Sequence, residues 1–477
     1  MTPILARLFQ FLIVFGSYQI SIKLFDPSEY GKLTIFFVIG SFFILLTISP
    51  FGSYFLANAQ KWHREDRVHS QIMIFLIVAI GLSIFVASAS ALGLIFFDDS
   101  ELYLAMVGFY IFGSAVTQTF ISLIAILYSI RASIFIANLN AVGCLSASLS
   151  FIYFLGRDIE FWILGQILFQ CFFAFILFAR YFYSSLSHLS WKSCTKFFKK
   201  SFKFATITSL ISVLTWALYQ SPKVLYSHLF DDISFGLVMA GLVLAGYVFA
   251  GFEALVNMYA QTFFYRDFDP ESPNHAGAWS LYVFRVTFCF TAIFMISVPI
   301  LDQVTMRIFT DEYVASRTYM AIGLICEYFR VVGGCFVLSG QYIQRPVINV
   351  IPLAYSSIFT VFLVLCMHLI FGLDTWLIVT TLPVGFLLYI LIAAFRNRKT
   401  SNLSLDSFKK PVVMLIVSAP LFLASYISMM YVVRDPTTWL AFSSLIFCGL
   451  LGGWGLSFSK HLLGGRSLLT ALLSRID

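Results

Sequence analysis

Charged residues are scarce in this chain. Only 11% of its 477 residues are Asp, Glu, Lys or Arg, whereas 60% are hydrophobic, and the mean hydropathy is +0.90. A soluble globular protein carries roughly a quarter charged residues, so this composition excludes that class. A helix crosses a bilayer with about 20 apolar residues, and apolar runs of that length follow one another along the sequence. The chain is therefore predicted to be an all-α polytopic membrane protein.

Motifs for metal binding and for disulfide bonds are also missing. The eight cysteines show no CxxC or Cys/His spacing, and all but Cys194 fall in apolar runs. We therefore predict no disulfide framework, no metal site and no cofactor. The net charge is +7, but an excess of Lys and Arg in a membrane protein mainly encodes orientation. No nucleic-acid partner is expected, whereas membrane lipids are.

About fourteen transmembrane helices are predicted. Arg7 precedes the first apolar run, which continues into Gln19 and Lys23 without a small-residue cleavage site, so we expect an uncleaved first helix. The spans are placed near 5–25, 33–59, 71–97, 102–130, 134–155, 161–183, 204–229, 235–264, 280–301, 317–340, 347–371, 375–395, 411–433 and 437–459.

These spans predict two six-helix lobes and two extra C-terminal helices. The expected units are an N-terminal lobe (1–183), a basic cytoplasmic linker (184–203), a C-terminal lobe (204–396), a basic cytoplasmic loop (397–410), helices 13 and 14 (411–459) and a cytoplasmic tail (460–477).

The loops predict the orientation of the chain. Cytoplasmic loops of membrane proteins are rich in Lys and Arg. Alternate loops here contain basic groups such as Lys61–Arg67 and Lys192–Lys203, while the opposite loops contain acids such as Asp231 and Asp232. Both termini are therefore predicted to be cytoplasmic.

An internal repeat links the two lobes. Leu24-Phe25-Asp26 is followed by an aromatic residue and Gly31, and Leu229-Phe230-Asp231 is followed at the same spacing by Phe235-Gly236. A weaker echo pairs Phe97-Asp98-Asp99 with Phe309-Thr310-Asp311. Because the two copies lie six spans apart, the halves should be parallel repeats around an axis along the membrane normal, with a central cavity between them.

Two turns resemble a known family. Phe-Asp-Pro-Ser-Glu-Tyr-Gly (25–31) and Phe-Thr-Asp-Glu-Tyr-Val-Ala (309–315), with the basic stretch Lys61–Arg67, are similar to the Wzx-type O-antigen and polysaccharide flippases. These belong to the multidrug/oligosaccharidyl-lipid/polysaccharide exporter superfamily, with the lipid II flippase MurJ and the MATE drug exporters. Many relatives carry an acidic–Arg pair in helix 7, where this chain has Pro222-Lys223.

The resemblance implies a function. It implies a flippase that moves undecaprenyl-pyrophosphate-linked repeat units of O-antigen, capsule or exopolysaccharide from the cytoplasmic to the periplasmic leaflet by alternating access. It also implies a cationic cavity and a location in the inner (plasma) membrane of a bacterium. A polysaccharide polymerase is an expected partner in the membrane, and the glycan itself is left open.

Ionisable residues inside the spans are the candidate site. An intramembrane charge usually faces a partner or a watery cavity. Cationic cavity candidates for the pyrophosphate are Lys223, Arg330, Lys23, Arg285 and Arg7. Snorkelling of Lys23 and Arg285, and a topology anchor at Arg7, are the alternative readings.

Two acids and a proline complete the candidate set. Glu327 and Arg330 are spaced i, i+3, so they are predicted either to neutralise each other or to act as a gate. Glu253 has no obvious partner in the sequence, so it is predicted either to couple transport to H⁺ or Na⁺ or to be a hydrogen-bonded, partly hydrated side chain. Pro222 is predicted to break helix 7 next to Lys223.

Three other functions compete with this one. A lipid II flippase would share the mechanism, but the abundant cavity arginines expected of it are absent. A MATE-type exporter of drugs or cations should offer acids in its cavity, whereas the intramembrane charges here are mostly basic. A membrane polymerase or ligase needs a sizeable outer loop, and the outer loops are short. A transporter rather than an enzyme is therefore predicted.

Overall fold

The computed structural model describes residues 3–65, 67–96, 106–182, 191–267, 309–342, 346–372 and 374–400, with scattered positions between 279 and 297. Fourteen α-helices and two short 3₁₀ helices lie in this part of the chain, and it contains no strand. The α-helices are α1 (Pro3–Leu24), α2 (Pro27–Leu46), α3 (Ile48–Arg64), α4 (Val68–Phe96), α6 (Val107–Leu127), α7 (Ile130–Leu155), α8 (Ile159–Tyr181), α9 (Trp191–Tyr219), α10 (Ser221–Leu229), α11 (Asp232–Asp267), α13 (Ser316–Tyr342), α14 (Val350–Phe371), α15 (Thr375–Val379) and α16 (Thr381–Thr400). The 3₁₀ helices are η2 (Asp311–Tyr313) and η3 (Pro346–Asn349).

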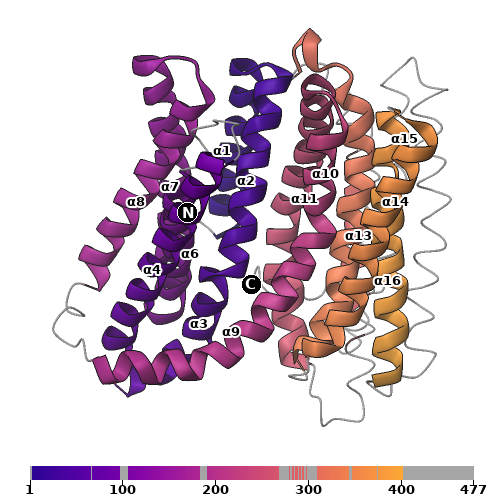
Figure 1. Cartoon of the computed structure of the whole chain (residues 1–477). Helices are drawn as coiled ribbons and strands as arrows, with labels where there is room; N and C mark the ends of the chain where they lie inside the picture. Colours follow the sequence, from indigo (N-terminus) through magenta and orange to yellow (C-terminus); the bar gives the residue numbers. More distant parts are fainter. Residues whose placement is uncertain are drawn as a thin grey trace, which may run out of the picture.

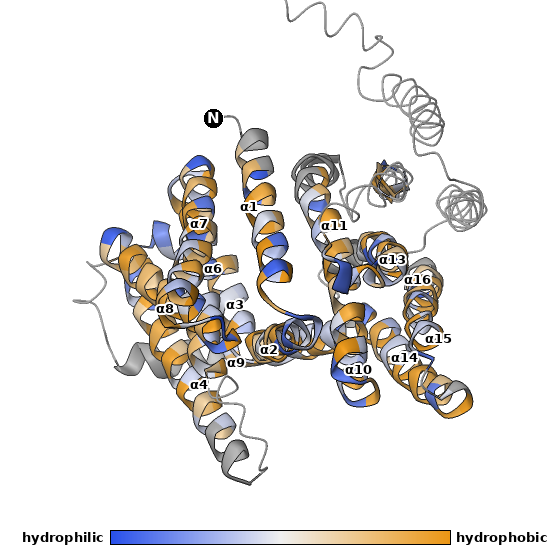
Figure 2. Ribbon diagram, turned by 90° about the horizontal axis from the view of Figure 1, so that it is seen from above, coloured by the Kyte–Doolittle hydropathy of each residue, from blue (hydrophilic) through white to orange (hydrophobic). Residues whose placement is uncertain are grey.

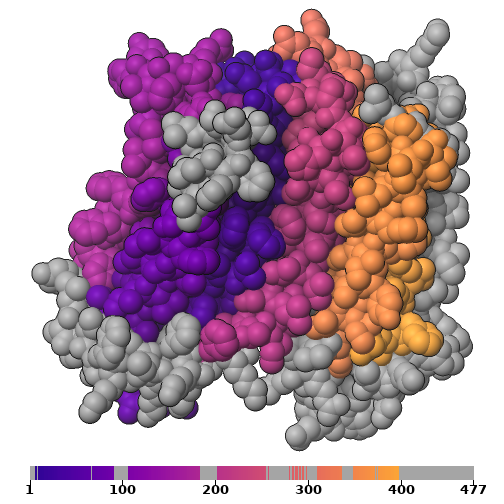
Figure 3. Space-filling view, viewed as in Figure 1, coloured from indigo at the N-terminus to yellow at the C-terminus, as the bar shows by residue number. Residues whose placement is uncertain are grey.

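The helices form two groups. Figure 1 shows the first-half helices α1 to α8 on one side and α10 to α16 on the other, and α9 runs along the lower edge beneath the first group. The two groups meet mainly where α2 and α1 pack against α11, and the space-filling view shows the indigo N-terminal part of the chain directly beside the pink middle part (Figure 3). The described part of the chain is thus a two-lobe, all-α molecule.

The outer surface is apolar. Eight of the described helices are long and apolar enough to cross a membrane, and the periphery of the bundle is mostly hydrophobic in Figure 2. Large apolar side chains such as Phe135, Leu369 and Phe395 are exposed there. A water-soluble protein rarely exposes so much apolar surface, so lipid is the solvent that this surface fits.

The described helices account for eleven of the fourteen predicted spans. The span at 280–301 is described only at scattered positions, and those at 411–433 and 437–459 lie outside the described residues, as does Phe97-Asp98-Asp99. The segment predicted as a linker is partly helical, because α9 already begins at Trp191. No Gly or Pro follows Trp191 in this segment to end a helix.

The second predicted span is divided, which the sequence reading missed. It forms α2 and α3, with the break at Thr47. Pro50 has no N–H with which to bond the carbonyl of Leu46 four residues earlier. The Ser209 hydroxyl of α9 donates to that carbonyl at 3.1 Å instead. A neighbouring helix thus satisfies the carbonyl that the proline leaves without a partner.

The two repeated turns meet at one end of the molecule. We call this contact the seam: residues 24–31 of the first half against residues 229–236 of the second. Asp26 caps α2 through the backbone N–H of Glu29, and Asp231 accepts from the backbone N–H of Ser234 at the start of α11. The repeated Asp is therefore a helix N-cap in both halves.

Glycine allows the backbones of the two turns in the seam to approach each other closely. A Cβ at Gly236 would lie 1.6 Å from the carbonyl oxygen of Pro27, so only glycine permits this approach. Across the same contact, the hydroxyl of Ser28 donates to Asp232 at 3.5 Å. The hydroxyl of Tyr313, in η2, donates to the carbonyl of Phe25 at 2.9 Å. The seam thus joins the two lobes through a close backbone approach and two side-chain hydrogen bonds.

Candidate functional site

The seventh predicted span is broken next to a lysine. α9 ends at Tyr219 and α10 begins at Ser221, with Gln220 between them and Pro222 in the first turn of α10. Proline is tolerated in a first turn, where its missing N–H would have no helical partner. The break places Gln220 and Lys223 at the point where two cavities adjoin.

Two adjoining cavities lie between the lobes. The large cavity has a volume of about 640 Å³ and the small cavity about 380 Å³. The small cavity touches α2 mainly between Tyr30 and Val38, nearer the seam, whereas the large cavity touches α2 only at Ser41 and Leu45. Both cavities are lined by Ser41, Gln220, Lys223, Val243 and Tyr247.

An ion cluster forms one wall of the large cavity. Arg330 on α13 donates from Nε to Glu327 and from Nη2 to Glu253 on α11, each at 2.5 Å. All three side chains are about three-quarters buried. The partner of Glu253 lies 77 residues away in the sequence, so spacing along a single helix could not identify it. The contact between Glu327 and Arg330 is present in this conformation.

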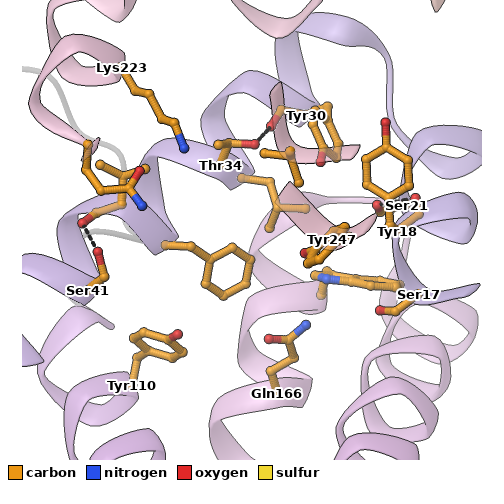
Figure 4. Close-up of a pocket in the computed structure, with 16 residues that line it drawn as sticks. Ser17, Tyr18, Ser21, Tyr30, Thr34, Ser41, Tyr110, Gln166, Lys223 and Tyr247 are labelled. Carbon is orange, nitrogen blue, oxygen red and sulfur yellow. Dashed lines mark hydrogen bonds between the residues drawn. The ribbon is translucent and has the colours of Figure 1, made fainter. Parts of the chain in front are cut away.

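Lys223 differs from Arg330 in its surroundings. Two carboxylates compensate the charge of Arg330, while Lys223 forms no ion pair within the described residues. The side chain of Lys223 reaches from α10 toward the small cavity (Figure 4). Among the described residues that line the two cavities, Lys223 is therefore the one cation without a paired carboxylate.

The other three predicted cations lie apart from this pair. Arg7 donates to Gln10 on its own helix at 2.7 Å, Lys23 is exposed at the end of α1, and Arg285 is half-buried in the sparsely described region. None of the three lines the large or the small cavity. Within the described residues there is also no group of three or more His, Cys, Asp or Glu side chains that could hold a metal ion.

Uncharged polar residues of the small cavity were not predicted. Gln166 on α8 and Tyr247 on α11 line it, together with Tyr18 and Ser21 on α1 and Tyr110 on α6. A glutamine inside an apolar helix such as α8 was the available signal, because an amide without a partner is costly in a membrane. The tyrosines gave no signal, since aromatic residues are frequent throughout the chain.

Comparison with known proteins places the fold. No protein-family model and no curated protein sequence matches the chain. Among solved structures, an inward-facing MATE multidrug transporter of the MOP superfamily has a TM-score of 0.58 at 12% identity, covering 84% of this chain and 98% of that one. The lipid II flippase MurJ, in an inward closed conformation, has a TM-score of 0.55 at 14% identity, covering 96% and 98%.

The fold is that of the MOP-superfamily transporters. A further structure of this fold, a MOP-superfamily transporter from Pyrococcus furiosus, has a TM-score of 0.54 at 11% identity over 84% of this chain and 94% of that one. For that transporter, a reversed polarity of the binding pocket suggests a different function. The charges lining the cavities therefore bear more on function than the fold does.

Proposed function

We propose that this chain is a flippase for an anionic lipid-linked oligosaccharide, an undecaprenyl-pyrophosphate-linked repeat unit of a surface polysaccharide. The observation that carries the proposal is Lys223, a lysine that lines both cavities between the lobes and makes no ion pair within the described residues. A pyrophosphate is a strong partner for an ammonium group, through charge-assisted hydrogen bonds.

The acids of the large cavity argue against an exporter of organic cations. Glu253 and Glu327 are both engaged by Arg330, so each carboxylate already has a cationic partner within the protein. The similarity in fold to MurJ, a lipid II flippase, also supports a lipid-linked cargo. Lipid II itself stays the nearest alternative cargo.

Membrane potential can supply the direction of transport. With the seam on the periplasmic side, as the loop charges predict, the cargo moves outward from a negative interior. Such a movement releases about 2.3 kcal/mol per negative charge per 100 mV. Coupling of the ion cluster to H⁺ or Na⁺ is an additional proposal that this energetic argument does not require.

The test is a deletion strain of the source bacterium complemented with variants. We expect deletion to accumulate complete undecaprenyl-linked repeat units and to abolish the surface polymer. Lys223→Gln should reduce surface polymer roughly tenfold or more, because a charge-assisted contact is lost, and Lys223→Arg should restore part of it. Lys23→Gln is the matched control, because it removes an exposed lysine outside the cavities.

Two results would overturn the proposal. Normal levels of lipid-linked units with raised sensitivity to cationic dyes would identify a drug exporter. Unpolymerised repeat units at the cell surface would identify a polymerase or ligase.

A further inference from the structure

The small cavity has the lining of a sugar site. Of its sixteen lining residues, four are Tyr, one is Trp, four are Ser or Thr and two are Gln. It holds no carboxylate, and Lys223 is its single charged residue. A sugar ring presents hydroxyls at its edge and C–H groups on its faces, which match hydroxyl and amide groups placed between aromatic rings.

The aromatic rings are held rigidly. The Tyr18 hydroxyl donates to the carbonyl of Ala240 at 2.8 Å, and its ring lies edge-on to Tyr30 and Tyr247, with centroids 6.0 and 5.6 Å away. These contacts link α1, α2 and α11 around the cavity. A wall ordered in advance costs little further entropy when a ligand binds.

Gln166 supplies the second, independent observation. It lies on the apolar helix α8, and Figure 4 shows its amide pointing into the small cavity from the side opposite Lys223. Within the described part of the chain its side chain makes no hydrogen bond. An amide in such a helix is costly unless it meets water or a ligand, and a cavity that it faces provides the room for one.

We infer that the small cavity binds the uncharged sugar attached to the pyrophosphate of the cargo, with Gln166 and Tyr247 as its polar contacts. The inference rests on the proposed function, because Lys223 fixes the position of the pyrophosphate where the two cavities adjoin. The volume of about 380 Å³ lies in the range of roughly 300–1,000 Å³ of small-molecule pockets. It holds a short stretch of glycan and leaves the rest of the cargo to the large cavity.

Binding of short-chain probes to the purified full-length chain tests the inference. The probes are farnesyl diphosphate and farnesyl-diphosphate-linked glucose, galactose and N-acetylglucosamine, in a detergent without a sugar headgroup. We expect at least one glycosylated probe to bind about tenfold more tightly than farnesyl diphosphate, the gain of one or two net hydrogen bonds. Gln166→Leu should abolish this ratio, and Tyr247→Phe, which removes only a hydroxyl, should reduce it.

The controls separate the sugar site from the proposed function. Gln170→Leu changes a glutamine one turn further along α8 that lines neither cavity, so it should keep the ratio. Lys223→Gln should weaken all four probes. Equal affinity for glycosylated and bare probes, with Lys223 still required, would overturn the sugar site alone. Failure of the wild-type chain to bind any diphosphate probe would overturn the proposed function as well.

Discussion

At the scale of single residues, the two cations of the cavities have different physical situations. Arg330 is held by Glu253 and Glu327 in a fixed cluster, whereas Lys223 keeps its donors available to a ligand. Removing one member of a partly buried ion cluster destabilises a structure, because the charges of the remaining members are left buried without a partner. We therefore propose that Arg330 stabilises the second lobe and that Lys223 contacts the cargo.

Replacing Arg330 should expose this difference. We expect Arg330→Gln to lower the free energy of unfolding by about 1–3 kcal/mol, because two carboxylates lose their partner in a three-quarters buried site. Adding Glu253→Gln and Glu327→Gln should recover most of the loss. Thermal unfolding in detergent is the measurement, with Lys23→Gln as the exposed control. An Arg330→Gln variant that unfolds at the wild-type temperature would contradict this assignment.

At the scale of helices, the sequence predicted the spans and one of their breaks. Hydrophobic runs predicted the eleven described spans, because a membrane-spanning helix can be recognised from its own apolar residues alone. The Pro222 break could be predicted because a proline interrupts the helix that contains it. The division at Thr47 also lies beside a proline, Pro50, but it was missed because the apolar run continues through it. The pairing of Arg330 with Glu253 and the gathering of Gln166, Tyr247 and Lys223 depend on packing between distant helices, which spacing along one helix does not contain.

The break between α2 and α3 gives an element-scale prediction. Ser209→Ala should destabilise the protein by about 1 kcal/mol, because the Leu46 carbonyl loses the hydroxyl that bonds it. Thr206→Ala is the matched control on α9, since the Thr206 hydroxyl bonds only the carbonyl of Phe202 on its own helix. Chemical denaturation in mixed micelles measures both variants. Equal losses for the two would rule out a special role of the Ser209 contact.

At the scale of the whole molecule, the two copies of the repeated turn contact each other. Asp26 and Asp231 cap equivalent helices, and the turns that they start form the seam. In the proposed cycle, the cavities lie on one side of this closed contact, and passage of the cargo requires the seam to part. The two glycine-containing turns are therefore the parts of the molecule whose close contact defines the present conformation.

A methyl group at the seam should shift the conformational equilibrium. Gly236→Ala places a Cβ against the Pro27 carbonyl, so the seam should close less often. Cysteines introduced by Ser28→Cys and Asp232→Cys should form a crosslink readily in the parent chain and several-fold less with Gly236→Ala, as quantified by mass spectrometry of the linked peptides. Gly81→Ala, where a Cβ meets nothing within 4 Å, should leave the crosslink unchanged. Unaltered crosslinking in the Gly236→Ala chain would argue against the seam as the closing contact.

The long helix α9 has a mechanical consequence. Its 29 residues span about 43 Å, and it packs against α2, α3 and α4 of the first half and against α14 of the second. A continuous helix resists bending, so the lobes cannot swing apart freely at the end where α9 crosses between them. The compliant point is Gln220, where the hydrogen-bonded ladder stops beside Lys223. Strain from any swing of the lobes is thereby delivered to Gln220 and Lys223, which line both cavities and which the proposed function places against the cargo.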